Sequence, residues 1–154
     1  MEHEPLADPD FVQRTLGVYA ALNARDFEAI MGMFGPAAVW DVSRWGLGTH
    51  AGLDAIGHFL EDWFGTLDDY EVQVEEIHGL GGGVVQAVVE QIAHRAGVRG
   101  VLVMRSAPVF VWGPDARIAQ LTLYRDTEEA RARAEGLVEA HRRRSPEGAA
   151  GYQA

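Results

Sequence analysis

Four apolar-rich runs between residues 70 and 126 constrain the fold of this chain more than any other feature. Their sequences are YEVQVEEIHGL, VVQAVVEQIAHR, VLVMRSAPVFVW and IAQLTLYRD, and the segments GGG, AGVRG and GPDAR separate them. Period-two alternation and β-branched residues are typical of strands, and short glycine-containing connections are typical of hairpins. The second half of the chain therefore predicts four long strands that pair antiparallel.

The first 65 residues instead show the three-to-four-residue spacing of amphipathic helices. A short strand is predicted at 37–42, after Gly35 and Pro36 end the second helix. A residue that can act as an N-cap precedes each predicted helix, and these residues are Asp10, Asp26, Asp54 and, after the last strand, Thr127. This order indicates an α+β fold, in which a curved antiparallel sheet wraps around the N-terminal helices as a cone and encloses an apolar pocket.

Length and composition restrict the class of protein. The chain has 154 residues and a formal net charge of −10, which argues against nucleic acid or an anionic membrane as a partner. There is no cysteine, and all 13 basic residues are arginine, so disulfides, thiolate chemistry and Schiff bases on a lysine side chain are excluded. No signal segment or membrane-spanning run is present, so we expect a cytoplasmic protein with a flexible arm at 1–8, one domain at 9–144 and a flexible tail at 145–154.

Three segments carry a resemblance to a known family: YAALNARDFEAIMGMFGPAAVWD, GTHAGLDAIGHFLEDWFGTLDDYEVQVEEI and FVWGPDARIAQLTLYRDTEEARARAEGL. They resemble the SnoaL-like family of the nuclear-transport-factor-two-like superfamily, whose members include ketosteroid isomerases and polyketide cyclases. The resemblance covers roughly residues 9–138 and implies a cystatin-like, cone-shaped α+β barrel. It says little about activity, because this fold carries isomerases, cyclases, epoxide hydrolases, dehydratases and binding modules.

The resemblance implies catalytic positions only where this sequence matches them. Asp41 lies near the position of the catalytic base of ketosteroid isomerases, at the end of the first strand. Their oxyanion-hole tyrosine falls at about Val18, and their late acid falls near Ser106 or Ala107. Limonene epoxide hydrolases place an aspartate two residues after an arginine, whereas here the residue two positions after Arg105 is Ala107. Neither full catalytic set is present.

The segment VWDVSRWGLGTHAG places Asp41 directly after Trp40, with Trp45 and His50 nearby. Desolvation by the indoles would raise the pKa of Asp41 and make it a general base near neutral pH. The alternative is a strand-end carboxylate that hydrogen-bonds the following loop. His50 is the second candidate catalytic residue, although a lone loop histidine is more often a surface residue. No spacing of His, Asp and Glu resembles a metal site.

We predict the pocket wall from aromatic side chains and from strand alternation. Aromatic rings suit a flat apolar ligand, although the helical spacing of Phe59 and Trp63 equally suits a plain core. Alternation places Gln91 and Arg125 on the inner face of the sheet, and an ion pair with Asp126 or a helix acid is the alternative for Arg125. The predicted substrate-binding residues are Tyr19, Trp40, Trp45, Phe59, Trp63, Gln91, Arg105, Leu121, Leu123 and Arg125.

Two functions stay open at this point. The first is a cofactor-free enzyme that uses general acid/base chemistry to isomerise, cyclise or hydrate a carbonyl or polyketide-like substrate, or to open an epoxide with Asp41 and Asp68 or Asp69. The second is a catalytically silent module of the same fold that binds a small molecule or dimerises. Both predict a small hydrophobic partner without a cofactor, and the family resemblance implies a homodimer through the outer face of the sheet.

Overall fold

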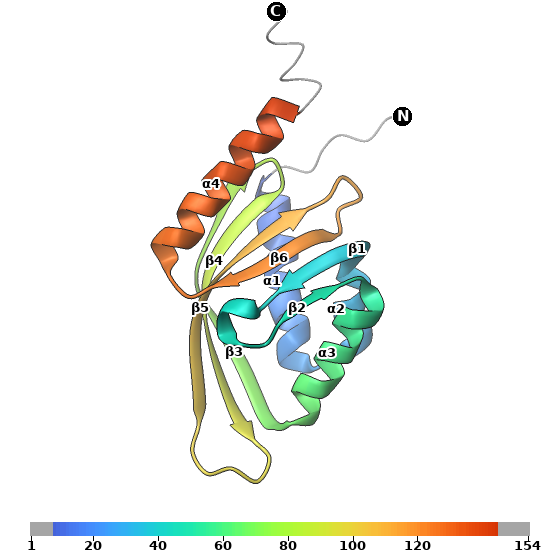
Figure 1. The fold of residues 1–154 in the computed structure, drawn as a ribbon, viewed down its shortest axis with the longest axis vertical. Helices are drawn as coiled ribbons and strands as arrows, with labels where there is room; N and C mark the ends of the chain where they lie inside the picture. The colour runs from blue at the N-terminus through green and yellow to red at the C-terminus, as the bar shows by residue number, and fades with distance from the viewer. Residues whose placement is uncertain (1–7, 145–154) are drawn as a thin grey trace, which may run out of the picture.

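The computed structural model describes residues 8–144. The predicted tail, and the predicted arm except for Asp8, lie outside this range. Its elements in chain order are α1 (Asp8–Ala24), α2 (Phe27–Met33), β1 (Phe34–Asp41), the short 3-10 helix η1 (Ser43–Trp45), β2 (Thr49–Ala51), α3 (Leu53–Gly65), β3 (Leu67–Gly81), β4 (Val84–Arg95), β5 (Leu102–Trp112), β6 (Ile118–Tyr124) and α4 (Thr127–Arg144). Figure 1 shows the helices arranged around one curved sheet. The predicted α+β fold is confirmed.

The six strands form a single sheet in the order β2-β1-β6-β5-β4-β3. Strands β3 to β6 pair antiparallel along the sheet, as the four apolar runs predicted. Strand β1 pairs parallel with β6, which sets Trp40 opposite Leu121. Strand β2 was not predicted, and it pairs antiparallel with β1. The parallel pairing brings the first strand of the chain beside the last one and so joins both halves of the sequence in one inner face.

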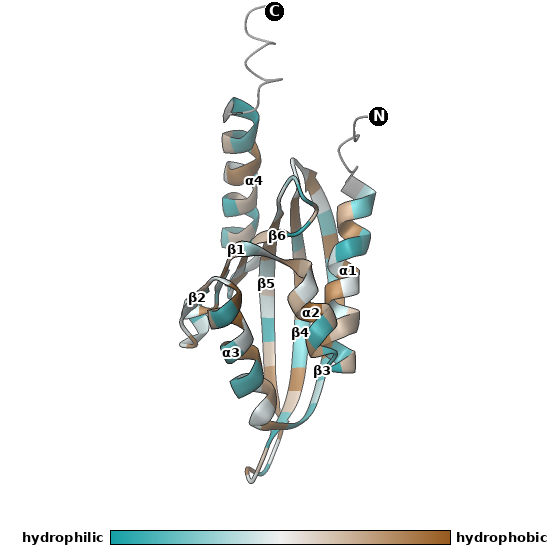
Figure 2. Cartoon of the chain, turned by 90° about the vertical axis from the view of Figure 1, so that its right-hand side faces the viewer, coloured by the Kyte–Doolittle hydropathy of each residue, from teal (hydrophilic) through white to brown (hydrophobic). Residues whose placement is uncertain are grey.

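Successive strand residues point to opposite faces of the sheet. Val85 and Phe110 belong to the main core on the inner face, which α1, α2 and α3 cover. Val84 and Val109 point the other way and pack with Ala134 of α4. Figure 2 shows α4 and α1 on opposite sides of the strands. Because α4 covers part of the outer face, only the remainder is open to a second copy, and the homodimer stays a prediction.

Acidic side chains cap two helices. Asp26 accepts the backbone N–H of Ala29 at 3.1 Å, as predicted for the start of α2. At α4 the prediction was one residue off, because Asp126 accepts the N–H of Glu129 at 3.0 Å and Thr127 is already helical. Asp126 therefore caps the N-terminus of α4.

Two other predicted helix starts were wrong. Gly52, with φ of +89°, occupies the N-cap position of α3. Asp54 therefore lies in the first turn, where its negative charge interacts favourably with the helix dipole. Helix α1 begins at Asp8, before the predicted cap Asp10. Glycine fits the position before α3 because side-chain-bearing residues rarely adopt this backbone conformation.

Asn23 connects the end of α1 to the edge strand β3. Its side-chain nitrogen Nδ2 donates to the carbonyl of Val72 at 3.0 Å, and its oxygen Oδ1 accepts from the N–H of Val72 at 2.7 Å. Since β3 is the last strand of the sheet, these backbone groups have no neighbouring strand to pair with. The amide therefore replaces a strand partner and fixes α1, which carries Tyr19, over the inner face.

Replacing Asn23 with alanine should lower the free energy of unfolding by about 1–3 kcal/mol, because two half-buried backbone groups lose their partner. Asn23→Asp keeps the acceptor for the Val72 N–H but sets a second carboxylate oxygen against the Val72 carbonyl, so it should destabilise the fold as well. Urea unfolding followed by circular dichroism, with an unchanged m-value, measures both losses. An Asn23→Ala variant as stable as the wild type would show that the bidentate contact is unimportant.

Candidate functional site

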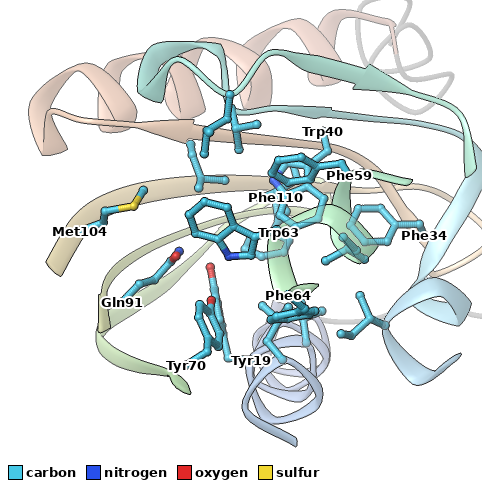
Figure 3. Close-up of a pocket in the computed structure, with 18 residues that line it drawn as sticks. Tyr19, Phe34, Trp40, Phe59, Trp63, Phe64, Tyr70, Gln91, Met104 and Phe110 are labelled. Atoms are coloured by element: carbon cyan, nitrogen blue, oxygen red, sulfur yellow. The ribbon is translucent and has the colours of Figure 1, made fainter. Parts of the chain in front are cut away.

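An aromatic-lined cavity lies between the inner face of the sheet and the helices α1, α2 and α3 (Figure 3). The cavity volume, counted as the space that the centre of a water molecule can reach, is about 40 Å³. A bicyclic ligand can therefore enter only if half-buried side chains such as Trp63 rotate. The lining residues are Val18, Tyr19, Leu22, Ile30, Phe34, Trp40, Val42, Leu47, Phe59, Leu60, Trp63, Phe64, Tyr70, Gln91, Met104, Phe110, Leu121 and Leu123.

The structure brings together most of the residues that the sequence assigned to the ligand. Asp41, His50, Trp45, Arg105 and Arg125 do not line the cavity. The predicted residues that do line it are Tyr19, Trp40, Phe59, Trp63, Gln91, Leu121 and Leu123.

Aromatic rings form a continuous wall on one side of the cavity. Trp40 stacks on Phe34 with ring centres 5.6 Å apart, and Phe59 meets Trp40 edge-on at 5.2 Å. Phe59 in turn stacks with Trp63 at 6.3 Å. Such rings bury large apolar areas and hold their geometry through a few torsion angles, so the wall favours a flat apolar molecule.

Three polar side chains gather at another part of the wall. Figure 3 shows Tyr19 and Tyr70 side by side, with Gln91 projecting into the same space. Burial raises the pKa of the Tyr70 phenol, and burial together with the neighbouring Tyr70 raises the pKa of Tyr19 well above its ordinary value. Both phenols stay protonated at neutral pH and can donate hydrogen bonds. All three side chains line the cavity, so their polar groups are available to a ligand there.

Sequence reasoning missed several lining residues, of which Tyr70 matters most. Tyr70 starts the alternation Tyr70, Val72 and Val74, whose members all belong to or pack against the inner core. Period-two alternation could have identified it, because Tyr70 shares a strand face with Val72 and Val74. Phe110 was missed for another reason, since β5 is apolar on both faces and alternation carries little information there.

Asp41 ends β1 and organises the loop that follows it. Its Oδ1 accepts hydrogen bonds from the Ser43 N–H at 3.0 Å, the Ser43 hydroxyl at 2.6 Å and the Thr49 hydroxyl at 3.1 Å. Arg44 lies 3.5 Å from Oδ2. Partial burial alone would raise the pKa of Asp41, but these hydrogen bonds and the Arg44 charge together lower it below its ordinary value. This geometry favours the loop-capping alternative over a desolvated base.

His50 supports the cavity wall from behind. Its Nε2 lies 2.8 Å from the carbonyl oxygen of Leu47, and because a carbonyl can only accept, Nε2 carries the proton. The imidazole stacks on Phe59 with ring centres 4.3 Å apart. Leu47 and Phe59 both line the cavity, so His50 positions two wall residues without reaching the space itself.

The two arginines predicted to bind ligand have other partners. Arg105 is exposed on the outer face and forms an ion pair with Glu75 at 2.6 Å. The guanidinium of Arg125 lies 4.7 Å from the ring centre of Trp45, a cation–π contact instead of the ion pair considered above. Trp45 itself packs against the main core without lining the cavity.

Asp68 and Asp69 are exposed, and neither lines the cavity, so neither meets Asp41 there. Among the described residues no group of three or more His, Asp and Glu side chains is placed to hold a metal ion. No helix in residues 8–144 combines the length and the apolar content needed to cross a bilayer.

A carboxyl-carbon NMR titration should give Asp41 a pKa below the reference of about 3.9. Asp41→Ala should lower the free energy of unfolding by about 1 kcal/mol at neutral pH, because Ser43 and Thr49 lose a charged acceptor. Since the folded pKa is depressed, this stabilisation is present above the unfolded pKa and is lost as the pH falls through the folded one. A pKa above the reference would contradict the loop-capping role.

The fold matches solved structures of related proteins. A nuclear-transport-factor-two-like protein of unknown function from Burkholderia pseudomallei is 18% identical, with 80% of this chain and 95% of that chain covered and a TM-score of 0.66. An LEH-like epoxide hydrolase from Mycobacterium tuberculosis is 18% identical, with 86% and 96% covered and a TM-score of 0.63. Rv0760c from Mycobacterium tuberculosis, solved with estradiol-17β-hemisuccinate, is 13% identical, with 74% and 92% covered and a TM-score of 0.64. At these identities the likeness shows the fold alone.

No curated protein matches this chain in sequence. The sequence profile of the SnoaL-like domain, however, matches residues 16–121, which is more than half of the chain. The matched span includes Tyr19, Trp40, Tyr70 and Gln91 of the cavity. This chain therefore belongs to the SnoaL-like domain family.

Proposed function

We propose that this protein binds an uncharged, flat and mainly apolar small molecule, and that Tyr19, Tyr70 and Gln91 hold an oxygen atom of that molecule. The observation that carries the proposal is the cavity itself, in which three polar side chains converge inside an otherwise aromatic and aliphatic wall. Pockets that bind small molecules typically combine a large apolar lining with a few converging polar groups.

The charge state of the wall selects an uncharged ligand. No Asp, Glu, His, Lys or Arg is among the lining residues, and the two phenols are neutral at pH 7, with burial raising their pKa further. A charged ligand would lose its hydration here without gaining a counter-charge, which is costly. The phenol hydroxyls and the amide N–H groups can all donate, so together they can bind an acceptor such as a ketone oxygen.

Binding is favoured over acid/base catalysis by Asp41 or His50, because neither side chain reaches the cavity. The complex of Rv0760c with estradiol-17β-hemisuccinate supports the idea that this fold accommodates a steroid skeleton, although only the fold is shared. A general base is absent from the lining residues, so proton abstraction has no side chain to perform it.

Equilibrium dialysis with 1-tetralone and with tetralin, the same skeleton without the carbonyl, tests this proposal. Wild-type protein should bind 1-tetralone more tightly than tetralin. Tyr70→Phe should weaken 1-tetralone binding about five-fold, the equivalent of one hydrogen bond of about 1 kcal/mol, and should leave tetralin binding unchanged. Tyr19→Phe should act in the same direction.

The matched control is Tyr124→Phe, which removes a phenol hydroxyl on the outer face of the sheet, away from the cavity. This variant should bind both compounds like the wild type. Binding of neither compound, or equal binding of both in every variant, would contradict the proposal.

A second candidate is carbonyl activation, which the adjacent neutral phenols favour. Two donors on one carbonyl oxygen stabilise the negative charge of an enolate, provided that water or the substrate itself accepts the proton. NMR of 1-tetralone in D₂O measures exchange of the hydrogens next to its carbonyl. If the cavity only binds, the protein leaves the exchange rate unchanged, whereas acceleration that Tyr19→Phe abolishes would establish catalysis.

A further inference from the structure

Trp40 presents a further unpaired donor to the cavity, in addition to the donors of Tyr19, Tyr70 and Gln91. Only 8% of this residue is exposed, and it lines the cavity from β1. Within residues 8–144 its indole nitrogen Nε1 is fully buried and has no hydrogen-bond partner. Buried polar groups in native proteins are nearly always paired, because leaving one unpaired costs free energy. An unpaired buried N–H in the wall of a binding cavity therefore points to a partner supplied by the ligand.

The neighbours of Trp40 supply no strong acceptor. Its ring contacts Phe34 and Phe59, and its partner on β6 is Leu121. An aromatic face offers at most a weak N–H···π contact. Figure 3 shows the nitrogen-bearing edge of Trp40 on the cavity side, and it shows Tyr70 and Gln91 entering the cavity from another direction.

Trp112 shows that this fold can pair a buried indole. Trp112 is 5% exposed, and its Nε1 donates to the hydroxyl of Thr15 at 3.0 Å. Thr15 in turn donates to the carbonyl of Phe11 at 2.8 Å, so the whole network is satisfied. Within the described part of the chain, Trp45 Nε1 is also buried without a partner but does not line the cavity, so what distinguishes Trp40 is that its unpaired N–H lies in the cavity wall.

We propose that the ligand carries a second acceptor oxygen, which receives a hydrogen bond from Trp40 Nε1. This inference rests on the proposed binding function and narrows its ligand class to flat molecules with two separated acceptors, such as quinones and other cyclic diketones. Trp40 is then the residue that distinguishes a diketone from a monoketone. The absence of cysteine and lysine fits this class, because thiols and lysine amines are the groups that add to quinones.

The test compares three bicyclic probes by equilibrium dialysis, read from the absorbance of the probe: tetralin, 1-tetralone and 1,4-naphthoquinone. Wild-type protein should bind 1,4-naphthoquinone most tightly. Trp40→Phe keeps an aromatic ring but removes the N–H, and it should weaken 1,4-naphthoquinone binding about five- to ten-fold. The same variant should change 1-tetralone binding less than about two-fold, since Tyr19, Tyr70 and Gln91 already hold its single oxygen.

Trp112→Phe is the matched control, because it makes the same substitution at a buried indole whose N–H is already paired with Thr15 outside the cavity. It should leave the order of the three affinities unchanged, and circular dichroism verifies that both variants fold. An equal loss for all three probes in Trp40→Phe would show that Trp40 only packs, which overturns this inference and leaves the binding function intact. If no probe binds wild-type protein, the proposed function fails, and the inference fails with it.

Discussion

The burial of Phe110 at the centre of the inner sheet face is the constraint on which the rest of the structure depends. Phe110 is fully buried, lies between Val85 on β4 and Leu121 on β6, and meets Tyr19 of α1 edge-on at 5.9 Å. An apolar face of this size must be covered, and α1, α2 and α3 cover it. The sheet is curved, however, and helices are straight, so the coverage leaves a space beside Phe110. That space is the cavity, so the same packing that stabilises the fold creates the candidate site.

Two features give the cavity its chemistry. The parallel pairing of β1 with β6 places Trp40 beside Leu121 and so joins an indole from the first strand to the part of the wall that the last strand builds. Asn23 fixes α1 against β3, which sets Tyr19 next to Tyr70. The result is an aromatic space with neutral donors at different parts of its wall and no charged side chain among the lining residues. Such a wall recognises acceptors through hydrogen bonds and geometry.

The sequence predicted the strand half of the fold well, because alternation and hairpin turns are local signals that tertiary contacts seldom override. It did not predict β2, whose three residues are too short to show a period. The inner-face assignments of Gln91 and Leu121 agree with the structure, although the two faces of β4 are nearly balanced in apolar residues. The site prediction departed most from the structure at Asp41 and Arg125. Their partners are Thr49 at the start of β2 and Trp45 at the end of η1, and elements of three residues are too short to show which way their side chains turn.

The proposed binding site is the cavity, and not the loop around Asp41. One NMR titration tests this directly: the side-chain amide of Gln91 and the carboxyl carbon of Asp41 are followed in the same sample while 1-tetralone is added. We predict that the Gln91 amide signals shift and saturate with the ligand, while the Asp41 carboxyl signal stays in place because the hydrogen bonds to Ser43 and Thr49 persist. A ligand-dependent shift at Asp41 without one at Gln91 would contradict the account.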